Sequence, residues 1–184
     1  MRLMKFTFCK NKVAQVWVET VLYTMIAFTV IGLVLAYAQP EIEKFQDKSA
    51  IKQSINLMAD LDSKILEVLR NGEGNKRVLD LSVKRGSLSI NGTNDCLTFE
   101  IESSYPYTEI GEVYSEKGIA ITTSQLGGKS KITLLKNYSE MTNITYSGKE
   151  EIKILSQSST FYSAYVENKG GTSPSKTVVE IGLM

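Results

Sequence analysis

The apolar run at residues 21–38, VLYTMIAFTVIGLVLAYA, constrains the fold more than any other feature of this sequence. It lies within a stretch without formal charge that covers residues 20–39. A helix needs about 20 mainly apolar residues to cross a bilayer, so this run is just long enough. Residues 1–14 contain no acidic residue, and their basic residues are Arg2, Lys5, Lys10 and Lys12. Because a basic segment before an apolar one stays in the cytoplasm, we expect the rest of the chain to lie outside.

Three interpretations of the apolar run are open. It is an uncleaved single-pass anchor, or it is an ordinary secretory signal cut after Ala38, where Ala36-Tyr37-Ala38 fits the small-x-small pattern. In the third interpretation cleavage falls earlier, after Ala14, and the apolar helix stays on the mature protein.

The helical pattern continues beyond the run and favours the third interpretation. Apolar residues recur mostly at steps of three and four among polar ones: Ile42, Phe45, Ile51, Ile55, Met58, Leu61, Ile65, Val68 and Leu69. Pro40 can bend this helix, and Asn71-Gly72 is its first clear stop. We therefore predict a near-continuous helical stem over residues 16–70, about 80 Å long. Its apolar stripe must pack against the chain's own head or against neighbouring copies.

Glu19 lies at the front of the apolar segment. A carboxylate within a membrane costs a few kcal/mol and tends to have a partner. If the mature chain begins at Gln15, its α-amino group can pair with Glu19 of an adjacent helix and set the stagger between subunits. The alternative is an interfacial glutamate at the end of an uncleaved span.

The basic leader, Ala14 before Gln15, Glu19 at the fifth mature position and the retained apolar helix together resemble the class III signal of type IV pilins, in its archaeal form. The resemblance covers roughly the first forty residues. It implies that a prepilin peptidase cuts between Ala14 and Gln15 on the cytoplasmic side. It also implies that the helices bundle into a filament core, with Glu19 aiding subunit addition.

Residues 72–184 predict an all-β head. Short segments rich in β-branched and aromatic residues, several with clear alternation, are separated by turn signals such as Asn91-Gly92, Gly127-Gly128 and Ser147-Gly148. We expect strands at 77–83, 87–91, 96–103, 117–124, 131–136, 141–146, 151–156, 160–168 and 176–183. The predicted fold class is thus α+β: a long N-terminal hydrophobic and amphipathic helix followed by an antiparallel β head. The expected organisation is a leader at 1–14, a stem at 15–71 and a head at 72–184.

The head contains three acceptor sequons for N-glycosylation, at Asn91-Gly92-Thr93, Asn137-Tyr138-Ser139 and Asn143-Ile144-Thr145. Ordinary turn and strand chemistry explains each one equally well when it is taken alone. All three fall in the portion placed outside on other grounds, which favours sugar-bearing positions at Asn91, Asn137 and Asn143.

Composition argues against most catalytic and nucleic-acid functions. The net charge is +1, so nothing suggests nucleic acid, and the sequence has no histidine to act as a general base or metal ligand. Cys9 and Cys96 are too few for a zinc site or a disulfide framework. Gly127-Gly128-Lys129-Ser130 lacks the first glycine of a phosphate-binding loop, and Lys64 and Ile65 interrupt a calcium loop after Asp60 and Asp62. We expect no enzyme activity, cofactor or metal.

The resemblance to archaeal type IV pilins, together with the retained helix and the β head, favours a structural subunit of an archaeal type IV pilus-like surface filament, used for adhesion or cell contact. Its expected partners are copies of itself, a prepilin peptidase and the pilus assembly machinery. The expected location is the membrane before assembly and the extracellular surface after it. The alternative is a membrane-anchored or secreted β domain that binds a ligand or partner.

Overall fold

A computed structural model describes residues 12–171 and 176–184 of this chain, with side chains described from residue 16 onward. The chain forms two compact units, Met1–Glu43 and Lys44–Met184. One helix, α1 (Lys12–Asn71), supplies the described part of the first unit and the beginning of the second. The first eleven residues of the expected leader lie outside the described residues.

The helix ends where the sequence predicts. Asn71 is its last residue, and Gly72 follows with a φ of 84°, a left-handed conformation that suits glycine. The Asn75 side-chain amide donates to the carbonyl oxygens of Asn71 and Gly72 at 2.6 and 3.1 Å. Pro40 lies inside α1, where it removes one backbone donor.

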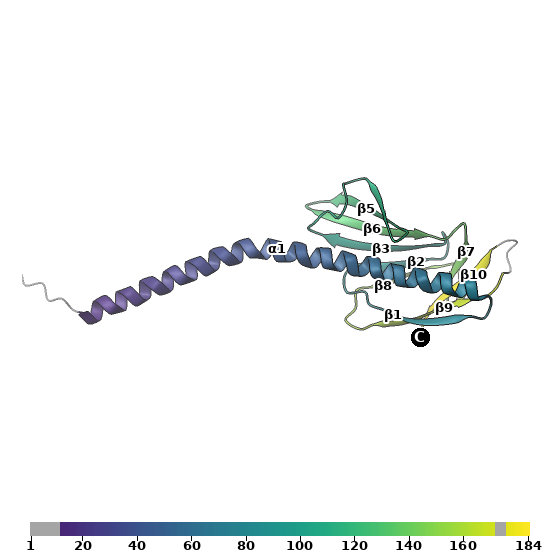
Figure 1. Cartoon of the computed structure of the whole chain (residues 1–184), viewed down its shortest axis with the longest axis horizontal. Helices are drawn as coiled ribbons and strands as arrows, with labels where there is room; N and C mark the ends of the chain where they lie inside the picture. Colours follow the sequence, from purple (N-terminus) through teal and green to yellow (C-terminus); the bar gives the residue numbers. More distant parts are fainter. Residues whose placement is uncertain (1–11, 172–175) are drawn as a thin grey trace, which may run out of the picture. The chain divides into compact units, whose positions relative to one another are not determined.

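The second unit contains a β head, so the predicted α+β fold class is confirmed. Its strands in the described residues are β1 (Lys76–Leu81), β2 (Ser87–Asn91), β3 (Cys96–Ser103), β4 (Val113–Glu116), β5 (Ile119–Leu126), β6 (Lys129–Asn137), β7 (Thr142–Tyr146), β8 (Ile152–Ser156), β9 (Tyr162–Asn168) and β10 (Thr177–Leu183). All but β4 coincide with segments expected from the sequence. Figure 1 shows these strands gathered along the second half of α1.

The strands form two sheets. A four-stranded sheet has the order β1-β9-β10-β7, and a six-stranded sheet has the order β4-β5-β6-β3-β2-β8. Every pair between named strands is antiparallel except β7 with β10, which is parallel. The exception arises because the chain leaves β7 for β8 in the other sheet and returns through the β9–β10 hairpin. The expected antiparallel head is thus confirmed in the main, with one parallel pair between named strands.

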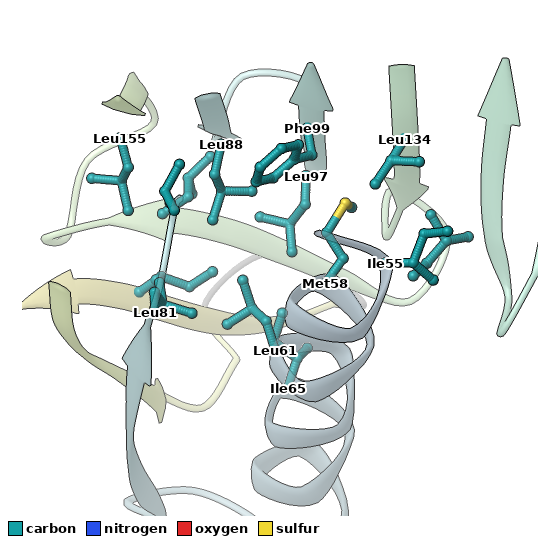
Figure 2. Close-up of a cluster of buried hydrophobic side chains, with 14 of the residues drawn as sticks. Ile55, Met58, Leu61, Ile65, Leu81, Leu88, Leu97, Phe99, Leu134 and Leu155 are labelled. Carbon is teal, nitrogen blue, oxygen red and sulfur yellow. The ribbon is translucent and has the colours of Figure 1, made fainter. Parts of the chain in front are cut away.

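The apolar stripe of α1 packs into the chain's own head. Ile51, Ile55, Met58, Leu61, Ile65 and Val68 are each at most 1% exposed. Figure 2 shows Met58 pointing toward Leu97 of β3 and Leu61 lying between Leu97 and Leu81, with Phe99 of β3 and Leu88 of β2 beyond them. Because burying one such side chain contributes about 1.5–3 kcal/mol, this stripe is a main source of stability for the second unit. Ile42 and Phe45 remain exposed.

Buried polar contacts fix the helix to the head, two of them at carboxylates of α1. Asp47 accepts hydrogen bonds from the backbone nitrogen of Ser104 at 2.6 Å and from the hydroxyl of Ser103 at 3.1 Å. Further along the helix, Asp62 accepts one from the Tyr138 hydroxyl at 2.8 Å. The two carboxylates are separated by about 20 Å of helix. Further along, the buried Asn168 side-chain amide donates to the Val68 carbonyl oxygen at 3.0 Å, so the helix is held along its packed length.

Candidate functional site

The first candidate site is the apolar segment of α1 in the first unit. From Val16 to Tyr37 its large apolar side chains are exposed, including Trp17 at 70% and Phe28 at 74%. Among the described residues one helix is long and apolar enough to span a membrane, with a mean hydropathy of 2.2 and none of the apolar window buried. Length and composition thus make this segment compatible with membrane anchoring.

The threonine hydroxyl groups in this segment have partners within the helix. Thr20, Thr24 and Thr29 each donate to a backbone carbonyl oxygen three or four residues earlier, at 2.8–2.9 Å. A hydroxyl that bonds back to its own helix is satisfied without water, so these threonines add little to the cost of an apolar environment.

Glu19 has a partner within its own helix. The Tyr23 hydroxyl donates to Glu19 Oε1 at 3.0 Å, one helical turn along. Sequence analysis missed this contact, although the four-residue spacing of the two side chains could have indicated it. Ala14 and Gln15 lie in the backbone of α1, and their side chains lie outside the described part of the chain.

The second candidate site consists of the sequons in the head. Asn91 ends β2, and its Oδ1 accepts hydrogen bonds from the backbone nitrogens of Thr93 and Asn94 at 3.0 and 3.1 Å. Asn137 ends β6, and its Oδ1 accepts a hydrogen bond from the backbone nitrogen of Ser139 at 2.9 Å. Both asparagines therefore form Asx turns, which hold the oxygen side of the carboxamide against the backbone.

Asn143 differs because it lies within β7 and forms no such turn. Its Nδ2 donates to Glu150 Oε1 at 2.9 Å. The Thr145 side chain of the same sequon is 6% exposed, and its hydroxyl oxygen is buried without a hydrogen-bond partner.

The fold brings the three sequons together at one end of the head. Asp95, in the turn between β2 and β3, contacts the other two sequons. Its carbonyl oxygen accepts from the Tyr138 nitrogen at 2.8 Å, and its Oδ1 accepts from the Ile144 nitrogen at 2.8 Å. This end lies near Asp62 of α1, away from Asp47, where the chain enters the second unit.

Strand register places two of the sequons on one face of the six-stranded sheet. Cys96 pairs with Asn91 of β2 on one side and with Asn137 of β6 on the other. The neighbouring Ile90, Leu97 and Lys136 point to the opposite, inner face, where Ile90 and Leu97 are fully buried. Asn91 and Asn137 are two strand spacings apart, about 10 Å, with the partly exposed Cys96 between them.

The segments that resemble ligand loops have structural roles. Gly127-Gly128 is the turn between β5 and β6, as the sequence predicts, and Asp62 lies buried in α1. Within residues 12–171 and 176–184, no group of three or more His, Cys, Asp and Glu side chains is arranged to hold a metal ion.

Comparison with known proteins yields no match: no family model, no curated protein and no solved structure is similar to this chain.

Proposed function

We propose that this chain is a structural subunit of an archaeal type IV pilus-like surface filament that displays a glycosylated β head for adhesion or cell contact. The observation that carries the proposal is the division of α1. Its second half is buried in the head, whereas the large apolar side chains of residues 16–37 are exposed in the part of the chain that the structure describes. Lipid before assembly, and neighbouring helices after it, would remove this surface from water.

Glu19 supports assembly through the same helix. With a chain that begins at Gln15, the α-amino group of one subunit can meet Glu19 of the next, which sets the axial stagger. The partners are therefore copies of this chain, a prepilin peptidase that cuts between Ala14 and Gln15, and the assembly machinery. The precursor lies in the cell membrane and the assembled subunit lies on the extracellular surface.

One contact favours a second candidate, a β domain merely anchored by an uncleaved helix. The Tyr23 hydroxyl gives Glu19 a partner within its own helix, so the carboxylate does not need a neighbouring subunit. In that case Glu19 is a residue at the membrane edge, and the head works as a monomer that binds a ligand or partner.

The first test is the N-terminal residue of the protein from its native cells, determined by mass spectrometry of the terminal peptide. The filament proposal expects Gln15. A start at Met1 would indicate the anchored form, and a start at Gln39 would indicate a secreted head.

The second test is the effect of Glu19→Ala on filaments, observed by electron microscopy. We expect filaments to be lost while the head stays folded. Glu43→Ala, which removes an exposed carboxylate further along the same helix, is the matched control and should leave filaments intact. Tyr23→Phe keeps the Glu19 carboxylate and removes only its internal hydrogen bond, so filaments should persist. Normal filaments in the Glu19→Ala variant would contradict the proposal.

A further inference from the structure

We propose that the three sequons are modified at different stages: Asn91 and Asn137 are open to glycosylation in the folded head, whereas Asn143 is glycosylated only before the head folds. The inference rests on the proposed use of these sequons and adds the order in which they are used. It follows from the exposure and hydrogen bonding of six side chains, the asparagine and the hydroxyl residue of each sequon.

The chemistry sets two requirements. The asparagine Nδ2 attacks the anomeric carbon of a saccharide that is esterified to a lipid-linked phosphate or diphosphate. A carbon–nitrogen bond forms, the carbon–oxygen bond to the phosphate breaks, and Nδ2 gives up one proton to a base of the transferase. Because the enzyme reads the serine or threonine two positions later, it must reach that hydroxyl as well as Nδ2.

Asn91 and Asn137 meet the first requirement in the folded head. Their Asx turns engage Oδ1, and in the described residues neither Nδ2 atom has a hydrogen-bond partner. Both side chains lie on the outer face of the six-stranded sheet. The attacking nitrogen of each is therefore directed away from the core with no bond to break.

Their hydroxyl residues meet the second requirement. Thr93 is exposed, and its hydroxyl makes only a long contact of 3.4 Å to the Glu150 carbonyl oxygen. Ser139 is partly exposed. A transferase can therefore reach both hydroxyls with the strands in place.

Asn143 fails both requirements once the head has folded. Its Nδ2 donates to Glu150, and its hydroxyl residue, Thr145, is buried. Asn91 and Asn137 end their strands, whereas Thr145 lies within β7, buried and paired with Glu180 of β10. Presenting the sequon to an enzyme would require β7 to leave its sheet.

The Thr145 hydroxyl gives an independent reason to place this step before folding. Its oxygen is buried without a partner, and a buried polar group that forms no hydrogen bond is unfavourable. Valine has nearly the same shape and would avoid this cost, so no contact of the described residues accounts for the hydroxyl. If the transferase recognises this sequon in the unfolded chain, the Thr145 hydroxyl has a function in that recognition.

The test compares modification during synthesis with modification after folding. The full chain is made in a cell-free system, with native-cell membranes as the source of transferase and lipid-linked saccharide. The membranes are present during synthesis in one arm and added to the folded, detergent-solubilised chain in the other. Occupancy of each asparagine is measured by mass spectrometry of glycopeptides. We expect all three sites to be occupied in the first arm, and only Asn91 and Asn137 in the second.

One variant separates the two barriers at Asn143. Glu150→Ala frees Nδ2 but leaves Thr145 buried, and since Glu150 is exposed the head should fold normally. We expect Asn143 to remain unmodified in the folded chain of this variant. Thr145→Ser keeps the sequon and should still be modified during synthesis, whereas Thr145→Val should not.

Equal occupancy of Asn143 in the two arms would overturn the proposed order, as would modification of Asn91 and Asn137 during synthesis only. No occupancy at any site in either arm would overturn the use of the sequons itself, and with it the glycosylated head of the proposed function. The N-terminal and filament tests are unaffected by either result.

Discussion

Tyr138, which follows β6, donates a hydrogen bond of 2.8 Å to Asp62 in α1, and both side chains are buried. Burial and then the Asp62 charge raise the pKa of the Tyr138 hydroxyl, so it stays protonated and remains a donor. Lys136 Nζ lies 3.2 Å from the other carboxylate oxygen of Asp62. A carboxylate in this position is tolerated because it has partners on both oxygens.

Tyr138→Phe is therefore expected to lower the free energy of unfolding by about 1–3 kcal/mol, since it leaves a buried carboxylate oxygen without its donor. The variant keeps the Asn137-x-Ser139 sequon. Urea unfolding of the purified chain, followed by circular dichroism, measures the change. Tyr114→Phe, on an exposed tyrosine of β4, is the control and should stay within about 0.5 kcal/mol of the wild type. Equal effects of the two substitutions would mean that the hydrogen bond to Asp62 contributes nothing.

The contacts of Asp47 predict that the free energy of unfolding depends on pH in the acidic range. Burial raises the pKa of this carboxyl, but hydrogen bonds from Ser104 and Ser103 and the charge of Arg85 outweigh burial and hold the pKa below its usual value. A depressed pKa means that the unfolded chain takes up the proton more readily than the folded chain. The carboxylate therefore stabilises the fold above pH of about 4, the ordinary value for Asp, and this contribution is lost as the pH falls further.

Asp47→Asn should thus cost about 1.5–3 kcal/mol at neutral pH, the typical contribution of hydrogen bonds to a charged group. The difference between variant and wild type should shrink below pH of about 4. Urea unfolding at several pH values measures it. Asp80→Asn, on an exposed carboxyl of β1 that accepts one hydrogen bond from Ser163, is the control and should have a smaller effect at neutral pH. A difference that stays constant as the pH falls would contradict the role of the Asp47 charge.

Position 182 in the four-stranded sheet has room for glycine but not for a larger residue. It pairs with Tyr165 across β10 and β9, and a Cβ added at residue 182 would lie 2.4 Å from the tyrosine ring. Lys76 Nζ lies 3.7 Å from the centroid of this ring, and the Tyr165 hydroxyl donates to Glu180 Oε1 at 2.6 Å, so the side chain cannot move aside without losing contacts. Gly182→Ala should therefore lower the free energy of unfolding by about 1–3 kcal/mol, measured by urea unfolding. Gly128→Ala, where nothing lies within 4 Å of the added Cβ, is the control and should have little effect.

The helix and most strands follow from local pattern. The apolar stripe of α1 and the alternation in segments such as 97–101 indicate which face is buried, and Asn71-Gly72 predicts where the helix ends. These predictions agree with the structure. β4 was missed because Val113, Tyr114 and Ser115 are all exposed, so the strand has no buried face to mark it. It forms through pairing with β5, which no periodicity in the strand itself reveals.

The grouping of the sequons could not be predicted, because it depends on pairing between segments distant in sequence. Which residues of β2 and β6 oppose Cys96 is decided by strand register and sheet order. The parallel pairing of β7 with β10, which buries Thr145, is likewise non-local. The alternation of a single strand indicates its buried face but leaves its neighbours undetermined.

The position of Cys96 gives the last prediction. Because Asn91 and Asn137 flank Cys96 on the outer face at about 5 Å, one strand spacing on each side, glycans on both asparagines should cover its thiol. In a Cys9→Ser background, we expect maleimide to label the glycosylated chain several-fold more slowly than the Asn91→Gln/Asn137→Gln variant. Asn143→Gln is the matched control, because Asn143 lies in the other sheet, and it should label like the glycosylated parent. The parent and the double variant could label at the same rate although Asn91 and Asn137 of the parent carry glycans. In that case the glycans do not cover the Cys96 thiol, and the shielding proposed from the sheet register would be wrong.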